Sequence, residues 1–284
     1  MDSEIELLRV ELDKSRSEMA QLQSELAETN KGVVALYAEL DDNAAQLREA
    51  ADLKSRFLSY MSHEFRTPLA SITSIADILI AGMDGPLTPE QQRQLQFVRG
   101  SVRELSEMVD DLLDLAKVDA GRISISPEWF EMVDLFSALR GMFKPIVGSG
   151  TVSLIFEEAS DIPKIYSDDK KLSQILRNFI SNALKFTAEG EVRVTARSVP
   201  GGMVEFAVSD TGIGIDKEHL PALFSDFVQI DTRIQKRLRG TGLGLSLAKK
   251  FAILLGGSVA VTSEVGRGSR FSVLIPTRYT SPPA

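Results

Sequence analysis

The first fifty residues carry an apolar repeat with alternating steps of three and four residues, and this repeat restricts the fold more than any other feature. It runs for about six heptads, which is long enough for a parallel two-stranded coiled coil. Since a lone helix could not bury such a stripe, we expect two chains to pair along it. The repeat positions are Ile5, Leu8, Leu12, Ser15, Met19, Leu22, Leu26, Thr29, Val33, Leu36, Leu40, Asn43, Leu47 and Ala50.

Composition excludes several classes of protein. The chain has 284 residues and no cysteine, so it has neither disulfides nor thiolate metal sites, and we expect a reducing, cytoplasmic compartment. We expect no membrane segment and no signal peptide, because apolar runs are short and the N-terminus is acidic. The net charge is −8, and residues 1–50 contribute 12 acidic and 5 basic side chains, or −7. This balance argues against nucleic acid as a partner.

A second helical pattern contains the octapeptide Ser-His-Glu-Phe-Arg-Thr-Pro-Leu at residues 62–69. With about 100° between successive residues, Phe65 and Leu69 fall on an apolar stripe that also contains Leu58, Met61, Ile72, Ala76 and Leu79. His63 points away from this stripe, toward solvent, and small residues follow it on the outer face. Glu64 could fix the imidazole tautomer, and Pro68 should bend the helix. The pattern favours a nucleophilic histidine, and the alternative is an ordinary surface histidine.

The helix of the octapeptide is expected to form a hairpin with the helix that follows it. A turn at Gly82–Leu87 leads to Thr88-Pro89-Glu90-Gln91, which is typical of a capped helix start. The second helix should extend to about Val118, and Gly121 should mark a domain boundary. Two such helices cannot enclose a core alone, so we predict a dimeric four-helix bundle and an obligate homodimer.

From Ile123 onward the pattern indicates an α+β sandwich with helices on one face of a sheet. We therefore predict three domains, at residues 1–50, 51–120 and 121–279. The expected strands are Ile123–Ile125, Thr151–Phe156, Glu191–Arg197, Met203–Ser209, Ser258–Ser263 and Gly268–Ile275, and the expected helices are Val133–Phe143, Asp169–Phe186, Lys217–Phe224 and Gly242–Leu255.

Four clusters in this last region suggest a nucleotide site. Asn178, Asn182 and Lys185 share one face of a helix, where amide oxygens suit Mg²⁺ and the ammonium suits phosphate. Asp210 ends a strand before a glycine-rich turn, and its carboxylate could accept from an exocyclic amine. Taken singly, the asparagine pair is more typical of polar helix surface than of a metal site, and the Asp210 cluster is typical of an ordinary turn.

The other two clusters surround a basic loop. Phe224–Gln229 precedes the loop and Gly240–Leu245 follows it, opening a helix whose N–H groups could hold phosphate oxygens. No strand precedes these glycines, so a dinucleotide fold is excluded. The loop between them suggests a lid over a triphosphate, or else a solvated charged loop.

Together the octapeptide and the four clusters resemble the sensor histidine kinases of bacterial two-component systems, over about residues 50–277. The octapeptide resembles the phosphoacceptor box, and the clusters resemble the N, G1, F and G2 boxes of the ATP-binding domain, whose fold is shared with gyrase-type ATPases. The resemblance implies ATP-dependent phosphorylation of His63, then transfer to an aspartate of a separate response regulator, with possible phosphatase activity toward that regulator.

The same resemblance assigns the site residues. It implies Glu64 as the base that takes the proton of His63, and Thr67 as the residue that orients water in the reverse reaction. Asn182 with Asn178 would bind Mg²⁺, Lys185 would bind phosphate and Asp210 would bind the adenine amino group. The remaining ATP-binding residues would be Gly212, Gly214, Phe227, Arg239, Gly240, Thr241, Gly242, Leu243, Gly244 and Leu245.

Two other functions remain open at this stage. A gyrase-like or chaperone-like ATPase would need a carboxylate on the helix that carries Asn178 and Asn182, and it would hydrolyse ATP independently of His63. A non-catalytic dimeric scaffold, phosphotransfer relay or phosphatase would not bind ATP.

Overall fold

The computed structural model describes residues 2–147, 151–157, 162–228 and 242–280. Contacts divide the chain into two units, residues 1–57 and 58–284. The first unit lies within α1 (Asp2–Ile80), a continuous helix. The large apolar side chains at its repeat positions from Met19 onward are exposed, among them Leu22, Leu26 and Leu40. Within the described ranges no helix is both long and apolar enough to cross a membrane.

The end of α1 and the helix α2 (Pro89–Asp119) form the predicted hairpin. Thr88 caps α2 as expected: its Oγ1 accepts from Gln91 N at 3.3 Å, and Gln91 Oε1 accepts from Thr88 N at 2.9 Å. Two ion pairs join the helices, Arg66–Asp110 at 2.7 Å and Arg99–Asp77 at 3.5 Å. Apolar side chains remain exposed on both helices, including Ile72, Ile75, Phe97 and Leu105. Pro68 lies inside α1 and does not end it.

A mixed five-stranded sheet follows, with the order β2-β4-β5-β7-β6. Only β2 and β4 pair in parallel, and the other pairs are antiparallel. The strands are β2 (Val152–Phe156), β4 (Gly190–Val199), β5 (Met203–Asp210), β6 (Ser258–Glu264) and β7 (Gly268–Pro276).

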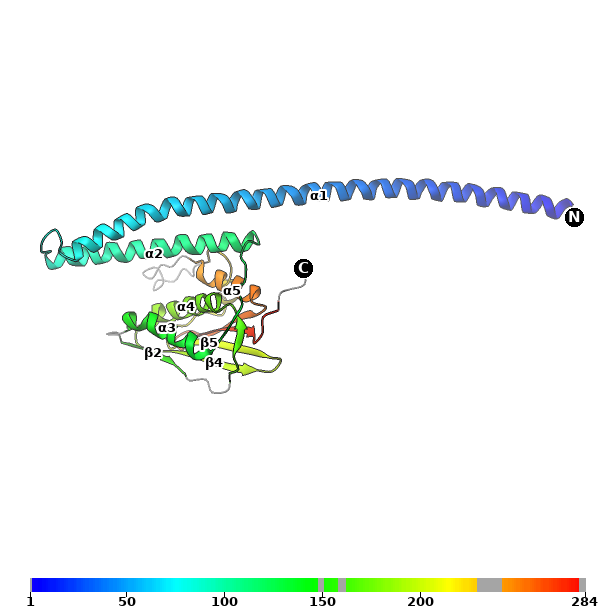
Figure 1. The fold of residues 1–284 in the computed structure, drawn as a ribbon. Coiled ribbons are helices and arrows are strands. Elements are labelled where there is room, and N and C mark those ends of the chain that lie inside the picture. Colours follow the sequence, from blue (N-terminus) through cyan, green and yellow to red (C-terminus); the bar gives the residue numbers. More distant parts are fainter. Residues whose placement is uncertain (1, 148–150, 158–161, 229–241, 281–284) are drawn as a thin grey trace. The chain divides into compact units, whose positions relative to one another are not determined.

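Three helices cover one face of this sheet, as predicted (Figure 1). They are α3 (Met132–Val147), α4 (Asp169–Phe186) and α5 (Gly244–Leu254). Inward-facing residues of alternate strand positions, such as Val192, Val194, Phe206 and Val208, are buried against Phe179 and other helix side chains. Each helix and strand thus buries the apolar side chains of one face, and this burial supplies most of the free energy that stabilises the domain.

Three predicted elements differ in the structure. Ile123 and Ile125 pack against the core but form no strand; the strand here is β1 (Glu128–Phe130), which pairs with β3 (Ile165–Ser167). The segment Lys217–Phe224 forms only the 3₁₀ turn η1 (Leu220–Ala222), because Pro221 supplies no N–H and the apolar stretch is short. Helix α5 begins two residues later than expected, because Gly242 has φ +71°, outside the helical range.

Candidate functional site

His63 lies on the solvent-facing side of α1, in a groove of about 610 Å³. The side chains that line the groove are those of His63, Arg66, Thr67, Ala70, Ser71, Ser74 and Ile75. The imidazole makes no hydrogen bond to any described residue, so both ring nitrogens are available. Glu64 is exposed and is not hydrogen-bonded to His63, so the expected tautomer-fixing bond is not present. Thr67 Oγ1 donates to the carbonyl of His63 at 3.2 Å.

The three polar residues predicted on one helix lie on α4. Asn178 Nδ2 donates to the carbonyl of Gly244 at 2.9 Å, which joins α4 to the first residue of α5. A β-carbon at Gly244 would lie 3.3 Å from Asn178 Cγ, so the two elements are in close contact. Asn182 is partly buried, and its amide bonds to no described residue. Burial lowers the pKa of Lys185, whereas the charge of Glu104 on α2 acts in the opposite direction.

Asp210 ends β5 and is only 9% exposed. Its Oδ1 accepts from the backbone N–H groups of Gly212 at 2.8 Å and Ser269 at 3.2 Å, and its Oδ2 bonds to no described residue. Burial raises the pKa of this carboxyl, while the two backbone donors act to lower it. Asp210 is therefore a buried, oriented acceptor with one oxygen left for a ligand.

The glycines after Asp210 fit tightly against neighbouring backbone. Gly214 has φ +69°, and a β-carbon there would lie 2.0 Å from the carbonyl oxygen of Glu264. At Gly212 it would lie 2.4 Å from the carbonyl oxygen of Phe186, the last residue of α4. Ile213 N also donates to that carbonyl at 3.3 Å. The loop of Asp210 is thus fixed against the helix of Asn178 and Asn182.

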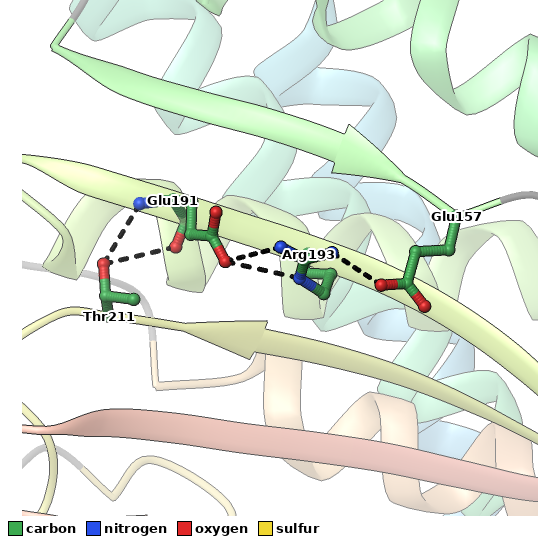
Figure 2. A network of polar contacts seen from close by, with 4 residues as sticks. All are labelled: Glu157, Glu191, Arg193 and Thr211. Atoms are coloured by element: carbon green, nitrogen blue, oxygen red, sulfur yellow. Dashed lines mark hydrogen bonds and ion pairs between the residues drawn. The ribbon is translucent and has the colours of Figure 1, made fainter.

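A polar network connects the same loop to β4 and to the end of the edge strand β2 (Figure 2). Thr211 Oγ1 accepts from Glu191 N at 3.0 Å and donates to Glu191 O at 3.4 Å. The Glu191 carboxylate accepts from Arg193 at 2.8 Å, and Arg193 also donates to Glu157 of the β2 end at 2.6 Å. Sequence reasoning missed these partners, and also Ser269. Glu191 and Arg193 are two residues apart on β4, but the other bonds join residues at least 20 positions apart in the chain.

The remaining predicted residues lie near the start of α5. Phe227 has φ +62° and is exposed, and a β-carbon at Gly242 would lie 3.1 Å from Phe227 C. Leu243 is buried and Leu245 packs against the core. Leu243 precedes α5 and contributes no side-chain cap to the helix. Arg239, Gly240 and Thr241 lie outside the described residues.

Helix α2 contacts α4 and α5 through polar side chains. Gln174 Nε2 donates to Asp114 Oδ2 at 3.0 Å, and Lys250 pairs with Asp119 and Asp226. Next to these contacts, burial and then the charges of Asp114, Glu107 and Asp110 raise the pKa of Asp111 to about 6, although Arg177 opposes the shift.

We expect the Asp111→Asn substitution to raise the free energy of unfolding at pH 7.5. The folded chain holds the Asp111 proton with a pKa of about 6, against 3.8 for an ordinary aspartate, so native stability from this group falls as pH rises through this window. Asparagine resembles the protonated form, so the advantage of the variant should disappear below about pH 4. Denaturant unfolding of both proteins from pH 4 to pH 8 measures this, and parallel stability curves would contradict it.

With the geometry in place, comparison with known families assigns the chain to a class. Residues 53–121 match the family described as His Kinase A (phospho-acceptor) domain. Residues 167–279 match the family described as histidine kinase-, DNA gyrase B-, and HSP90-like ATPase. The chain belongs to the sensor histidine kinases. It carries a phosphoacceptor domain and an ATPase-type nucleotide domain in the order expected from its sequence.

Several individual relatives are similar over most of this chain. An uncharacterized sensor-like histidine kinase of Rhizobium meliloti is 37% identical, with 85% of this chain and 46% of the relative covered. The circadian input-output histidine kinase CikA of Synechococcus elongatus is 35% identical, with 90% and 34% covered. The crystal structure of full-length ShkA in complex with AMPPNP has a TM-score of 0.66 and 32% identity, with 81% and 47% covered. This chain therefore spans less than half of each of these proteins.

Proposed function

We propose that this chain transfers the γ-phosphoryl group of ATP to His63, and then from phosphohistidine to an aspartate of a separate response-regulator receiver domain. The observation that supports this most directly is the exposed imidazole of His63, which makes no hydrogen bond to a described residue and lies in a groove whose lining includes several small side chains. Ala70, Ser71 and Ser74 leave room for a second protein surface to approach the ring.

The phosphoryl step uses one lone pair of the imidazole. A ring nitrogen of His63 forms the new N–P bond, and the bond between the γ-phosphorus and the bridging oxygen breaks, so that ADP leaves with the electron pair. The other ring nitrogen then carries a proton that the ring must lose, and the exposed Glu64 carboxylate is the proposed acceptor. In a separate phosphatase reaction, Thr67 would orient the water that attacks the phosphoaspartate of the regulator, which releases inorganic phosphate and restores the free aspartate.

The nucleotide would bind along the loop of Asp210 and the start of α5. Asp210 Oδ2 would accept from the adenine amino group, while Oδ1 stays bonded to Gly212 and Ser269. Lys185 and the N–H groups at the start of α5 would meet the phosphates, and Leu243 and Leu245 would pack beneath them. Phe227, Arg239, Gly240 and Thr241 complete the proposed contact set.

The amides of α4 fit a magnesium ion that arrives with ATP. The Asn182 amide bonds to no described residue, and the Asn178 amide is oriented by its bond to Gly244, so that amide oxygens remain for a hard cation. Within the described ranges, no cluster of three or more histidine or carboxylate side chains competes for a metal. The ion would neutralise charge on the phosphates while keeping most of its own waters.

We further propose that the chain functions as a homodimer. The apolar side chains left exposed on the hairpin and along the heptad repeat of α1 could be buried only by a second copy or a similar partner. In this proposal residues 1–50 are a coiled-coil signalling helix, residues 51–120 the dimerisation and phosphotransfer domain, and residues 121–279 the catalytic domain.

The chemistry of the phosphorylated product tests this function. Incubation with Mg²⁺ and ATP labelled at the γ-phosphate should place label on the chain, and the label should be lost in acid and retained in base, as for a phosphoramidate. The label should also pass to a receiver domain that accepts it. ATP hydrolysis with no labelled chain would instead support a gyrase-like ATPase, and an acid-stable label would contradict phosphohistidine.

A further inference from the structure

The groove at His63 contains a single cationic side chain among the residues that line it, that of Arg66. Arg66 follows His63 by three residues on the same helix, so the two side chains are neighbours on the helix surface. Its Nη2 lies 2.7 Å from Asp110 Oδ1 on α2. The bond uses one of the five N–H donors of the guanidinium, which leaves others for the groove.

Two of the hydroxyl groups that line the groove already have partners. Thr67 Oγ1 donates to the carbonyl of His63 at 3.2 Å, and Ser71 Oγ donates to the carbonyl of Thr67 at 3.1 Å. A phosphoryl group on His63 would bring close to two negative charges into this groove. Arg66 is the group best able to meet them.

The present partner of Arg66 holds it weakly. The side chains of Arg66 and Asp110 are 53% and 58% exposed, and exposed ion pairs of this kind contribute at most about 1 kcal/mol. A guanidinium binds a phosphoryl group through two parallel hydrogen bonds, which is a stronger arrangement. Exchange of the carboxylate for the phosphoryl group is therefore favourable.

We propose that Arg66 binds the phosphoryl group carried by His63, and that it leaves Asp110 to do so. This assignment rests on the proposed phosphorylation of His63. In this assignment Arg66 binds the phosphoryl group, and Asp110 competes with the phosphoryl group for Arg66. The two members of one ion pair therefore have opposite effects on the stability of phosphohistidine. It also means that phosphorylation removes one of the ties between α1 and α2.

The test measures the equilibrium constant for formation of phosphohistidine and ADP from the full chain and ATP with Mg²⁺. Arg66→Gln should lower this constant about tenfold, because it removes one charge-assisted contact. Asp110→Asn should raise it about twofold to threefold, because the competitor is neutralised. The double variant should match Arg66→Gln alone, since Asp110 acts only through Arg66. Arg66→Lys, which keeps the charge without the fork, should lie between Arg66→Gln and the unaltered chain.

A second ion pair between the same helices supplies the matched control. Arg99 and Asp77 lie 3.5 Å apart with side chains 44% and 54% exposed, and neither lines the groove. Arg99→Gln and Asp77→Asn should leave the equilibrium constant unchanged. Phosphorus NMR gives a second readout: the pKa of the phosphoryl group should be higher in Arg66→Gln than in the unaltered chain, and helix content by circular dichroism should be the same.

The outcomes separate this inference from the proposed function. If Arg66→Gln and Asp110→Asn lower the constant equally, the pair is only a tie between helices and the exchange is wrong. If Arg66→Gln changes neither the constant nor the phosphoryl pKa, the assignment of Arg66 is wrong while phosphorylation of His63 stands. If the unaltered chain forms no phosphohistidine, both proposals fail together.

Discussion

Replacing His63 by glutamine should remove all phosphoryl label from the chain while ATP binding stays unchanged. The glutamine amide nitrogen has no free lone pair, because it is delocalised into the carbonyl, so no N–P bond can form. The imidazole is exposed and makes no hydrogen bond to a described residue, so the substitution should change the unfolding free energy by no more than about 0.5 kcal/mol. Labelling with γ-labelled ATP, together with calorimetric titration of a non-hydrolysable analogue, measures both effects.

The matched control is His219→Gln. The chain contains two histidines, and His219 is exposed at the start of the 3₁₀ turn, outside the groove. This variant should keep full labelling. Label that persists in His63→Gln, or that disappears in His219→Gln, would place the acceptor elsewhere.

The second large effect is expected at the adenine carboxylate: Asp210→Asn should weaken ATP binding about 100-fold. Oδ1 accepts two backbone N–H bonds, and Oδ2 is the proposed acceptor for the adenine amino group. An asparagine must turn its NH₂ group either toward the two backbone donors or toward the adenine donor. Each orientation leaves donors facing each other in a buried site, at a cost of roughly 1–3 kcal/mol per unmade bond.

Asp216→Asn provides the comparison for this loop. Asp216 is exposed, and its Oδ1 accepts from Glu218 N at 3.0 Å without reaching Asp210. The Asp216→Asn variant should retain normal ATP affinity, measured by titration of the same analogue. Asp210→Asn with unchanged affinity and an unchanged preference for ATP over GTP would refute the adenine assignment.

Local patterns predicted the helical part of the structure well. The steps of three and four residues in α1 and the capping box at Thr88 depend on neighbours within one helical turn, so they can be recognised without the fold. The strand expected at Ile123–Ile125 was wrong because alternating apolar residues also suit an extended segment that packs on a core without a ladder partner. The helix expected at Lys217–Phe224 was wrong because Pro221 limited it to one turn.

The candidate site could be predicted by residue type but not by partner. The sequence indicated Asp210 and Asn178, and Gly212, which helps to orient Asp210, lies in the same turn. The other orienting bonds come from Ser269, 59 residues from Asp210, and Gly244, 66 residues from Asn178. The sequence did not indicate a role for Arg66, because its partner Asp110 is 44 residues distant and lies on another helix. The predicted roles of Arg239, Gly240 and Thr241 stay untested, since these residues lie outside the described part of the chain.

The two kinds of contact between α2 and the nucleotide domain differ in what their rupture would cost. Asp114 and Asp119 meet Gln174 and Lys250 through polar atoms, which water can replace with little loss. Val118, by contrast, packs against the apolar core, as does the segment just after the helix. Both kinds of contact lie near the C-terminal end of α2, so an apolar contact at Val118 is flanked by polar contacts at Asp114 and Asp119 that water can replace. Such a connection favours rotation of the nucleotide domain about the end of α2 over complete separation of the domain from the helix.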